Sequence, residues 1–207
     1  MSPRSVVFLG PPASGKGTQG RRLAEERGLA YLSTGALLRG ALRDDTALGK
    51  QARPFLERGE FVADEIMVPM VLEWVAQQEN GCLLDGFPRT VPQAEALDEA
   101  LEQKAQAIIL HVPDEELRRR VACRLECEKC HRVAGEGEGG GEECPKCPRC
   151  GGRLAQRADD ASANFENRLQ EYRRLVIPTI SYYCRLGRAR IVNGTGSPDD
   201  VYLRVRG

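Results

Sequence analysis

The feature that most constrains this chain is a glycine-rich stretch at residues 10–18, GPPASGKGT. It follows the pattern G-x-x-x-x-G-K, continued here by a small residue and a threonine, which is typical of phosphate-binding loops. An apolar run of strand formers at residues 5–9 precedes the loop, and residues 19–27 have the character of a helix. This order of strand, loop and helix predicts a site for the phosphate groups of a nucleotide.

The loop supplies several groups that favour phosphate. Backbone N–H groups in the turn and at the start of the helix face the anion, and the helix dipole favours its negative charge. Lys16 adds a point charge on the β- and γ-phosphates, and Thr18 supplies a hydroxyl toward Mg²⁺.

Strand-like and helix-like segments alternate along most of the chain, which predicts an α/β fold with a parallel sheet and helices on both faces. The expected later strands are residues 30–33, 82–86, 107–112 and 190–193. Asp64 and Asp114 are expected to cap helices, and residues 159–185 read as one long helix or two, broken near Pro178.

Two segments interrupt this alternation and are interpreted as inserted small domains. Residues 33–62 add helices without a strand, and residues 125–156 add a cysteine-rich piece. The core domain is then expected to consist of residues 1–32, 63–124 and 157–207.

Asp85 is a candidate Mg²⁺ group because it ends an apolar strand, Cys82–Leu84. In doubly wound α/β sheets, ligands bind outside the carboxyl ends of the strands. A carboxylate at that edge, close to a phosphate loop, can hold Mg²⁺ through water, although a plain helix cap would also explain it.

The cysteines predict a structural metal site. Cys127-x-x-Cys130 and Cys147-x-x-Cys150 form two knuckles, and four thiolates complete a tetrahedron that suits Zn²⁺. A set that uses Cys144 in place of Cys150 is also chemically possible, and His131 is a spare ligand. The glycine-rich run between the knuckles has no apolar periodicity, so the metal is expected to hold this segment together.

Composition narrows the class of protein. The 30 basic residues balance the 30 acidic residues, so nothing indicates a strongly basic nucleic-acid binder. We expect no membrane span, since no apolar run approaches eighteen residues. The first strand begins almost at once, which leaves no room for a signal peptide, and clustered thiols suit a reducing compartment, so a cytoplasmic location is expected.

Several stretches together resemble one family. They are GPPASGKGTQ at 10–19, STGALLR at 33–39, LLDGFPRTVPQA at 83–94 and QRADD at 156–160, together with the cysteine knuckles. The chain resembles bacterial-type adenylate kinases with a long, zinc-bearing lid, over nearly its whole length. The resemblance implies a P-loop nucleoside monophosphate kinase fold with a five-stranded parallel sheet, in which residues 33–62 bind AMP and residues 125–156 form the lid.

The resemblance also implies the site residues. For ATP they are Ala13, Ser14, Gly15, Lys16, Gly17, Thr18, Arg120, Arg124, Val133, Ala134 and Gly196. For AMP they are Thr34, Arg39, Glu60, Phe61, Val62, Gly86, Phe87, Pro88, Arg89, Gln93, Arg157 and Arg168, with Gln93 reading the adenine edge. The residues implied in catalysis are Lys16, Arg89, Arg124, Arg157 and Arg168, while Asp159 and Asp160 match an acidic pair beside the lid.

The chain departs from the family pattern in three places. Ala13 replaces a glycine, so the loop must keep φ negative there or carry strain. Ala36 replaces an aspartate that follows Thr-Gly. Val133 and Ala134 replace an aromatic contact to ATP.

The implied reaction is MgATP + AMP ⇌ 2 ADP, so the expected ligands are ATP, AMP and ADP. Mg²⁺ is the expected cofactor and Zn²⁺ the expected structural metal. The resemblance also implies that the protein is a monomer. We expect direct in-line transfer, because no Ser, Cys or His lies where a covalent intermediate would form. Two alternatives are a kinase for another nucleoside monophosphate, UMP or CMP, and a zinc-ribbon module that binds nucleic acid and carries a nucleotide switch.

Overall fold

The computed structural model describes residues 5–130, 132–134, 146–156, 160 and 162–207. Its centre is a five-stranded sheet in the order β2-β3-β1-β4-β8, and every pairing in it is parallel. The strands are β1 Val6–Leu9, β2 Ala30–Ser33, β3 Cys82–Asp85, β4 Gln106–His111 and β8 Ala189–Asn193. The expected parallel sheet is therefore confirmed, with the first strand in the middle.

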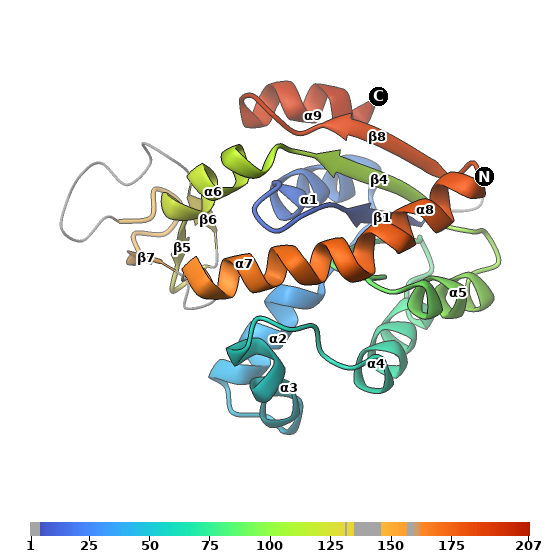
Figure 1. The fold of residues 1–207 in the computed structure, drawn as a ribbon, viewed down its shortest axis with the longest axis horizontal. Helices are drawn as coiled ribbons and strands as arrows, with labels where there is room; N and C mark the ends of the chain where they lie inside the picture. The colour runs from blue at the N-terminus through green and yellow to red at the C-terminus, as the bar shows by residue number, and fades with distance from the viewer. Residues whose placement is uncertain (1–4, 131, 135–145, 157–159, 161) are drawn as a thin grey trace.

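Helices cover both faces of the sheet (Figure 1). They are α1 Lys16–Arg27, α2 Thr34–Arg43, α3 Ala47–Glu57, α4 Asp64–Ala76, α5 Val91–Ala100, α6 Asp114–Ala122, α7 Ser162–Glu171, α8 Ile177–Arg185 and α9 Pro198–Arg206. Alternate residues of β1 enter different cores: Val6 and Phe8 pack with residues of α1 and α9, whereas Val7 and Leu9 pack with residues of α4, α5 and α8. This alternation explains why the strand is apolar throughout, since both of its faces are buried.

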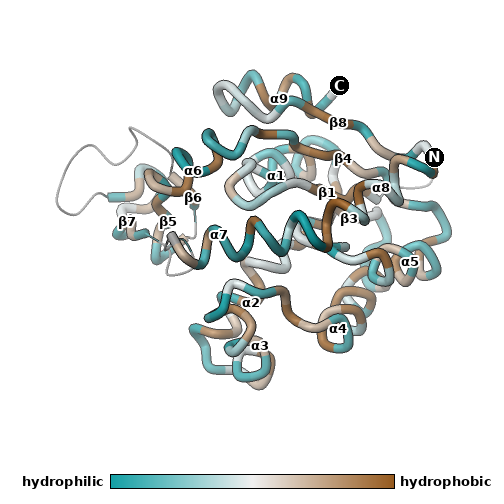
Figure 2. Tube along the Cα trace, in the orientation of Figure 1, coloured by the Kyte–Doolittle hydropathy of each residue, from teal (hydrophilic) through white to brown (hydrophobic). Residues whose placement is uncertain are grey.

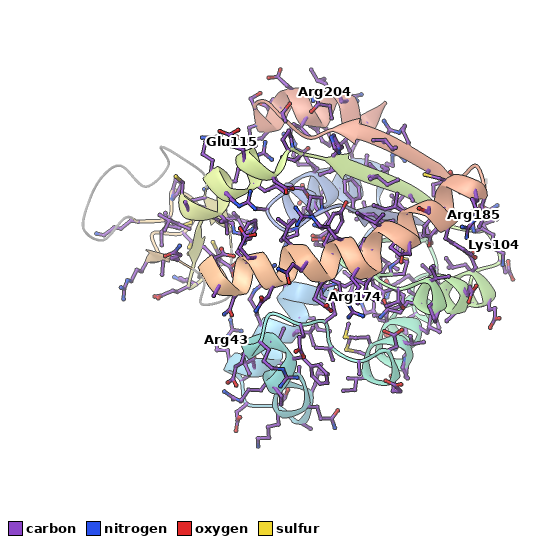
Figure 3. All side chains as sticks on the ribbon, in the orientation of Figure 1. Arg43, Lys104, Glu115, Arg174, Arg185 and Arg204 are labelled. Atoms are coloured by element: carbon purple, nitrogen blue, oxygen red, sulfur yellow. The ribbon has the colours of Figure 1, made fainter. Side chains whose placement is uncertain are left out.

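Hydropathy follows the same plan. In Figure 2 the central strands are mostly hydrophobic, and hydrophilic segments lie on the outer turns of the helices. Charged side chains such as Lys104, Arg185 and Arg204 are exposed and extend from the rim of the molecule in Figure 3. Within the described residues, no helix is both long and apolar enough to cross a bilayer.

Residues 33–62 and 125–156 add no strand to the five-stranded sheet. Helices α2 and α3 form a pair below it in Figure 1, and α2 is capped by the Ser33 hydroxyl, which accepts a hydrogen bond from the Ala36 N–H. The second insert holds a small antiparallel sheet of β5 Leu125–Cys127, β6 Val133–Ala134 and β7 Leu154–Ala155, in the order β6-β5-β7. These short strands were not expected from the sequence.

Three local predictions were wrong or incomplete. Asp64 and Asp114 do not cap helices: Ala63 and Pro113 occupy the cap positions, and the two carboxylates lie in the first turns of α4 and α6. The long C-terminal helix is interrupted by a π-helical segment, η2 Tyr172–Val176, after which Pro178 lies in the first turn of α8. A proline is tolerated there because a first-turn N–H has no partner within its own helix.

Candidate active site

The phosphate-binding loop joins β1 to α1 and places Lys16 at the carboxyl edge of the sheet. Lys16 begins α1, after Gly15 in a left-handed conformation. Its Nζ donates to the carbonyl oxygens of Gly10 at 2.8 Å and Pro11 at 2.7 Å. Burial lowers the pKa of Lys16 to about 8, against the opposing effect of the Asp85 charge. The Nζ also donates to the Ser14 hydroxyl at 3.5 Å. A half-buried ammonium with no carboxylate among these hydrogen-bond partners is a site prepared for an anion.

Three arginines reinforce this positive field. The charges of Arg89, Arg168 and Arg124 each lower the pKa of Lys16 further, in that order. Burial also lowers the pKa of Arg89 to about 10, with the charge of Arg168 adding to the effect. Four cations, from the phosphate loop, the turn after β3, α7 and the segment after α6, therefore lie close enough for their charges to act on Lys16.

A hollow beside this cluster has one apolar wall and two polar groups. Its lining residues are Leu38, Phe61, Val62, Met67, Gly86, Phe87, Arg89 and Gln93. The guanidinium of Arg89 lies over the Phe61 ring, 4.2 Å from its centroid. Residues separated widely in the sequence, at 61–62 and 86–93, are thus brought together around one small hollow.

The turn after β3 depends on glycine at position 86. Gly86 has a φ of 87°, and a Cβ there would lie 2.7 Å from the Thr34 hydroxyl oxygen. Its carbonyl accepts hydrogen bonds from Thr34 Oγ1 at 3.0 Å and Arg89 Nε at 2.7 Å. The hydrogen bond to this carbonyl holds the Arg89 side chain, which lines the hollow.

Other residues expected around AMP lie at the edge of this region. Arg39 is half-buried on α2. Glu60 is directed to a surface ion pair with Arg58 at 2.7 Å. Pro88 is buried directly before Arg89. Arg157 and Asp159 lie outside the described residues.

Asp85 ends β3 beside the phosphate loop, as the sequence predicted. It is 8% exposed, and its Oδ2 accepts a hydrogen bond from the Tyr31 hydroxyl at 2.9 Å. A Cβ on Gly17 would lie 3.4 Å from the same oxygen, so the carboxylate faces the start of α1, where Thr18 is exposed. A carboxylate and a hydroxyl at this edge are the oxygen donors that Mg²⁺ prefers.

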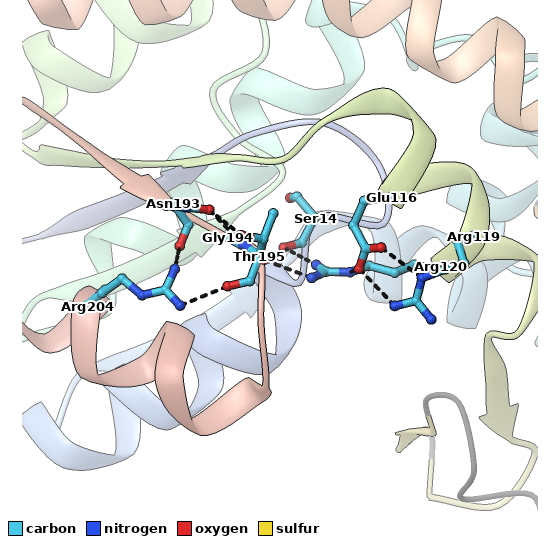
Figure 4. Close-up of polar contacts among 8 residues, drawn as sticks. All are labelled: Ser14, Glu116, Arg119, Arg120, Asn193, Gly194, Thr195 and Arg204. Atoms are coloured by element: carbon cyan, nitrogen blue, oxygen red, sulfur yellow. Dashed lines mark hydrogen bonds and ion pairs between the residues drawn. The ribbon is translucent and has the colours of Figure 1, made fainter.

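Arg120 links the phosphate loop to the loop after β8 (Figure 4). Its guanidinium donates to the carbonyls of Ser14 at 3.4 Å and Gly194 at 2.8 Å, and its Nε donates to Glu116 at 2.7 Å. Arg204 of α9 holds the same loop by donating to the carbonyls of Asn193 and Thr195. Gly196 follows with a φ of 102°.

Asp160 joins two of the converging arginines. Its side chain is fully buried and pairs with Arg124, whose Nε lies 2.7 Å from Oδ2, and with Arg168 at 3.4 Å. The side chains of Arg124 and Arg168 are 12% and 22% exposed. They are therefore held by a carboxylate in this structure.

The cysteine-rich segment, residues 125–156, contains a four-cysteine cluster. The sulfurs of Cys127, Cys130, Cys147 and Cys150 all lie within 4.8 Å of one another. The backbone N–H of Cys130 points at the Cys127 sulfur and lowers the pKa of that thiol. The four residues are positioned to hold a metal ion, and the chemistry of four thiols fits a soft, tetrahedral ion. The alternative ligands Cys144 and His131 lie outside the described residues.

The two residues expected to replace the aromatic contact to ATP have different surroundings. Val133 is 38% exposed, whereas the Ala134 side chain is fully buried beside Cys127, Cys147 and Leu154. Only Val133 of this pair presents a side chain on the surface of the lid.

The sequence interpretation missed three supporting contacts: Tyr31 with Asp85, Glu116 with Arg120, and Asp64 with Gln93. The Glu116–Arg120 pair has the i,i+4 spacing of a helical ion pair and could have been found from the sequence. The other two join distant elements, and nothing in the local sequence marks them.

A parallel α/β sheet with a phosphate loop, a cluster of cations and an adjoining hollow defines a P-loop phosphotransferase that acts on nucleotides. The adenylate kinase family model matches residues 8–188. The adenylate kinase of Thermodesulfovibrio yellowstonii is 41% identical over 97% of this chain and 96% of its own length. Those of Archaeoglobus fulgidus and Carboxydothermus hydrogenoformans are 40% and 37% identical, each over 97% of this chain and at least 95% of their own length.

The chain belongs to the adenylate kinase family. It is an ATP:AMP phosphotransferase, which moves a phosphoryl group reversibly from MgATP to AMP and gives two ADP.

Proposed function

We propose that the phosphoryl group passes directly from ATP to AMP over Lys16, with Arg89, Arg124, Arg157 and Arg168 around the transferred group. The observation that supports this proposal is that the charges of Arg89, Arg168 and Arg124 all act on the half-buried Lys16 and lower its pKa. Such a field opposes the negative charge of the transferred group and costs no reorganisation during the reaction. An AMP phosphate oxygen is already an anionic nucleophile, so no general base is needed.

AMP is proposed to occupy the hollow next to this cluster. Phe61 and Val62 offer an apolar surface for the base, Gln93 offers an amide for its edge, and Arg89 receives the phosphate. The remaining proposed AMP contacts are Thr34, Arg39, Glu60, Gly86, Phe87, Pro88, Arg157 and Arg168.

ATP is proposed to lie along the phosphate loop, residues 13–18, toward the loop after β8. Arg120 lies between these two loops and would meet the nucleotide there, with Arg124, Gly196 and the lid residues Val133 and Ala134. In this arrangement the γ-phosphate of ATP and the phosphate of AMP meet near Lys16.

Two metals complete the proposal. Asp85, through water, and Thr18 would hold the Mg²⁺ that comes with ATP, and this ion would neutralise and bridge phosphate oxygens. The four-cysteine cluster is assigned to Zn²⁺, because four thiolates with no open position suit a structural zinc site.

The proposed domains follow from these roles: a core of residues 1–32, 63–124 and 157–207, an AMP-binding insert at 33–62 and a lid at 125–156. Closure of both inserts over the nucleotides would exclude water and prevent wasteful hydrolysis of ATP. The monomeric state, the cytoplasmic location and the absence of nucleic-acid and membrane partners stay predictions.

The test combines an ADP-forming assay with variants. The enzyme is expected to make ADP from MgATP with AMP, and much less with UMP, CMP or GMP. Arg89→Ala is expected to lower turnover about 10²- to 10³-fold, because it removes a charge that stabilises the transition state.

Trp74→Phe is the control for this variant, since Trp74 packs against the core and touches no proposed ligand. Its turnover should stay close to that of the wild type. Equal losses in both variants would mean that activity follows stability, and ATP hydrolysis without transfer to AMP would overturn the proposal.

A further inference from the structure

We propose that Asp64 is a positioning residue that makes the acceptor site select adenine, by fixing the orientation of the Gln93 amide. This inference rests on the proposed function, in which Gln93 faces the base of the acceptor nucleotide. It gives Asp64 a role different from the helix cap expected from the sequence.

Gln93 is held at both ends of its amide. Its Oε1 accepts a hydrogen bond from the Arg89 backbone N–H at 2.7 Å. Its Nε2 donates to Asp64 Oδ1 at 2.6 Å. The side chain is 2% exposed, so water does not compete freely for these bonds.

The two partners allow only one orientation of the amide. A carboxylate can only accept, and a backbone N–H can only donate. If the amide of Gln93 were rotated by half a turn, its oxygen would face the Asp64 oxygen and its NH₂ group would face the Arg89 N–H. Both bonds would be lost, and like dipoles would oppose each other in a buried place.

Asp64 is itself held in position. Its second oxygen, Oδ2, accepts a hydrogen bond from Thr90 Oγ1 at 2.7 Å. The same Thr90 hydroxyl accepts from the Gln93 backbone N–H at 3.2 Å and caps α5. The carboxylate therefore joins the start of α4 to the start of α5, and it cannot turn away from Gln93 without breaking this contact.

The orientation of the amide decides which base it matches. After these two bonds, Gln93 keeps one N–H and one oxygen lone pair, in fixed relative positions. The edge of adenine offers a donor, its amino group, beside a ring-nitrogen acceptor, and a glutamine amide pairs with both. Guanine has a carbonyl oxygen where adenine has the amino group, so the fixed amide would meet it with oxygen against oxygen.

The hollow supports this assignment from its composition. Its lining is apolar except for Arg89 and Gln93. Arg89 is committed to the phosphate end, which leaves Gln93 as the polar side chain of the lining that can discriminate between bases. Fixing the orientation of this one amide would therefore determine which base the site accepts.

The experiment measures kcat and KM for AMP and for GMP in the wild type and in Asp64→Ala. We expect the variant to raise the KM for AMP about 10-fold with little change in kcat, because one orienting hydrogen bond to a charged group is lost. The ratio of kcat/KM for AMP to that for GMP should fall about 10-fold, and the KM for MgATP should not change.

Two further variants separate positioning from general damage. Asp64→Asn keeps an oxygen that can accept from Gln93, and it should restore most of the selectivity. Glu65→Ala removes the neighbouring exposed carboxylate from the same first turn of α4, so it is a matched control and should behave like the wild type. If Asp64→Ala does not fold, Asp64→Ser removes the same long acceptor and serves the same test.

A double-mutant cycle with Gln93→Ala completes the design. If Asp64 acts through Gln93, replacing Asp64 should not change the AMP-to-GMP ratio further once the amide is absent. The inference is overturned if Asp64→Ala keeps the wild-type ratio, or if the KM values for AMP and GMP rise equally. Failure of the wild type to make ADP from AMP would instead overturn the proposed function.

Discussion

Ala13 shows how one side chain can strain the phosphate loop. The sequence predicts either a negative φ at Ala13 or strain in the loop. The observed φ is 63°, in the left-handed region, so the loop is strained there. This conformation costs a residue with a Cβ about 1–2 kcal/mol, whereas glycine adds about 0.4–1 kcal/mol of chain entropy to the unfolded state. We therefore expect Ala13→Gly to stabilise the protein by about 0.5–1 kcal/mol and to raise Tm by about 2 °C in calorimetry.

A matched control for this variant is Ala96→Gly, within helix α5. Glycine in a helix interior costs about 1 kcal/mol, so this variant should lower Tm by about 2–4 °C. A lower Tm for Ala13→Gly as well would mean that the loop carries no relievable strain.

Lys16 makes the binding of ATP depend on pH. Burial lowers its pKa to about 8, so the free enzyme loses this cation as the pH rises through that value. We expect kcat/KM for MgATP to fall above about pH 8, as fewer molecules carry the charge that meets the phosphates. The arginine in Lys16→Arg stays charged at high pH. Activity of this variant should be lower, but its kcat/KM for MgATP should no longer fall above about pH 8.

The same pKa predicts the opposite trend for stability. In the unfolded chain Lys16 has its ordinary pKa of 10.5, so between pH 8 and 10.5 it binds more protons there than in the folded protein. The contribution of Lys16 to the free energy of unfolding therefore rises with pH across this window. Chemical unfolding of the wild type and of Lys16→Met at both ends of the window would measure it, and an identical pH trend in the two proteins would contradict the lowered pKa.

Among the elements, those with strong periodicity or a motif were predicted well. The strand before the phosphate loop was expected at residues 5–9 and is β1, Val6–Leu9, because both of its faces are buried. The strands of the lid were missed, since pieces of two or three residues are too short to show a period of two. The roles of Asp64 and Asp114 were misjudged because Gln93, Thr90 and Arg173 draw these carboxylates into contacts between elements.

We expect the cysteine-rich segment, residues 125–156, to depend on a bound metal more than on its packing. Its described buried core contains Cys127, Cys147, Ala134 and Leu154, two of them metal-ligand candidates. We expect a chelator to lower the free energy of unfolding by about 3 kcal/mol or more, because an ion bound only by the folded lid stabilises it by mass action. Calorimetry with and without chelator measures this, and elemental analysis identifies the metal.

Two variants sharpen this test. Cys147→Ser should reproduce the effect of the chelator, while Cys184→Ser, at an exposed cysteine outside the cluster, should not. Full stability after chelation, with all four cluster thiols reactive, would show that no metal supports the lid.

At the scale of the whole molecule, the sequence predicted the parallel sheet, because strand-like and helix-like segments alternate along the chain. It did not predict which carboxylate pairs with Arg124 and Arg168. Arg124 lies at the end of α6 and Arg168 lies in α7, and the buried Asp160 joins them. Such pairing depends on how separate elements pack, and no local pattern encodes it.

Asp160 therefore occupies, for these two arginines, the place that phosphates are proposed to take. Asp160→Asn should lower the stability of the free protein by about 3–5 kcal/mol, because the fully buried carboxylate that pairs with Arg124 and Arg168 loses its charge. A bisubstrate analogue, with two adenosines joined by a polyphosphate, should recover more stability in this variant than in the wild type, since its phosphates replace the missing charge. Calorimetry with and without the analogue measures both effects.

Asp199→Asn is the control, because its carboxylate is 85% exposed and pairs only at the surface with Arg22. Equal shifts in the two variants would mean that Asp160 and the nucleotide phosphates do not exchange places on the same arginines.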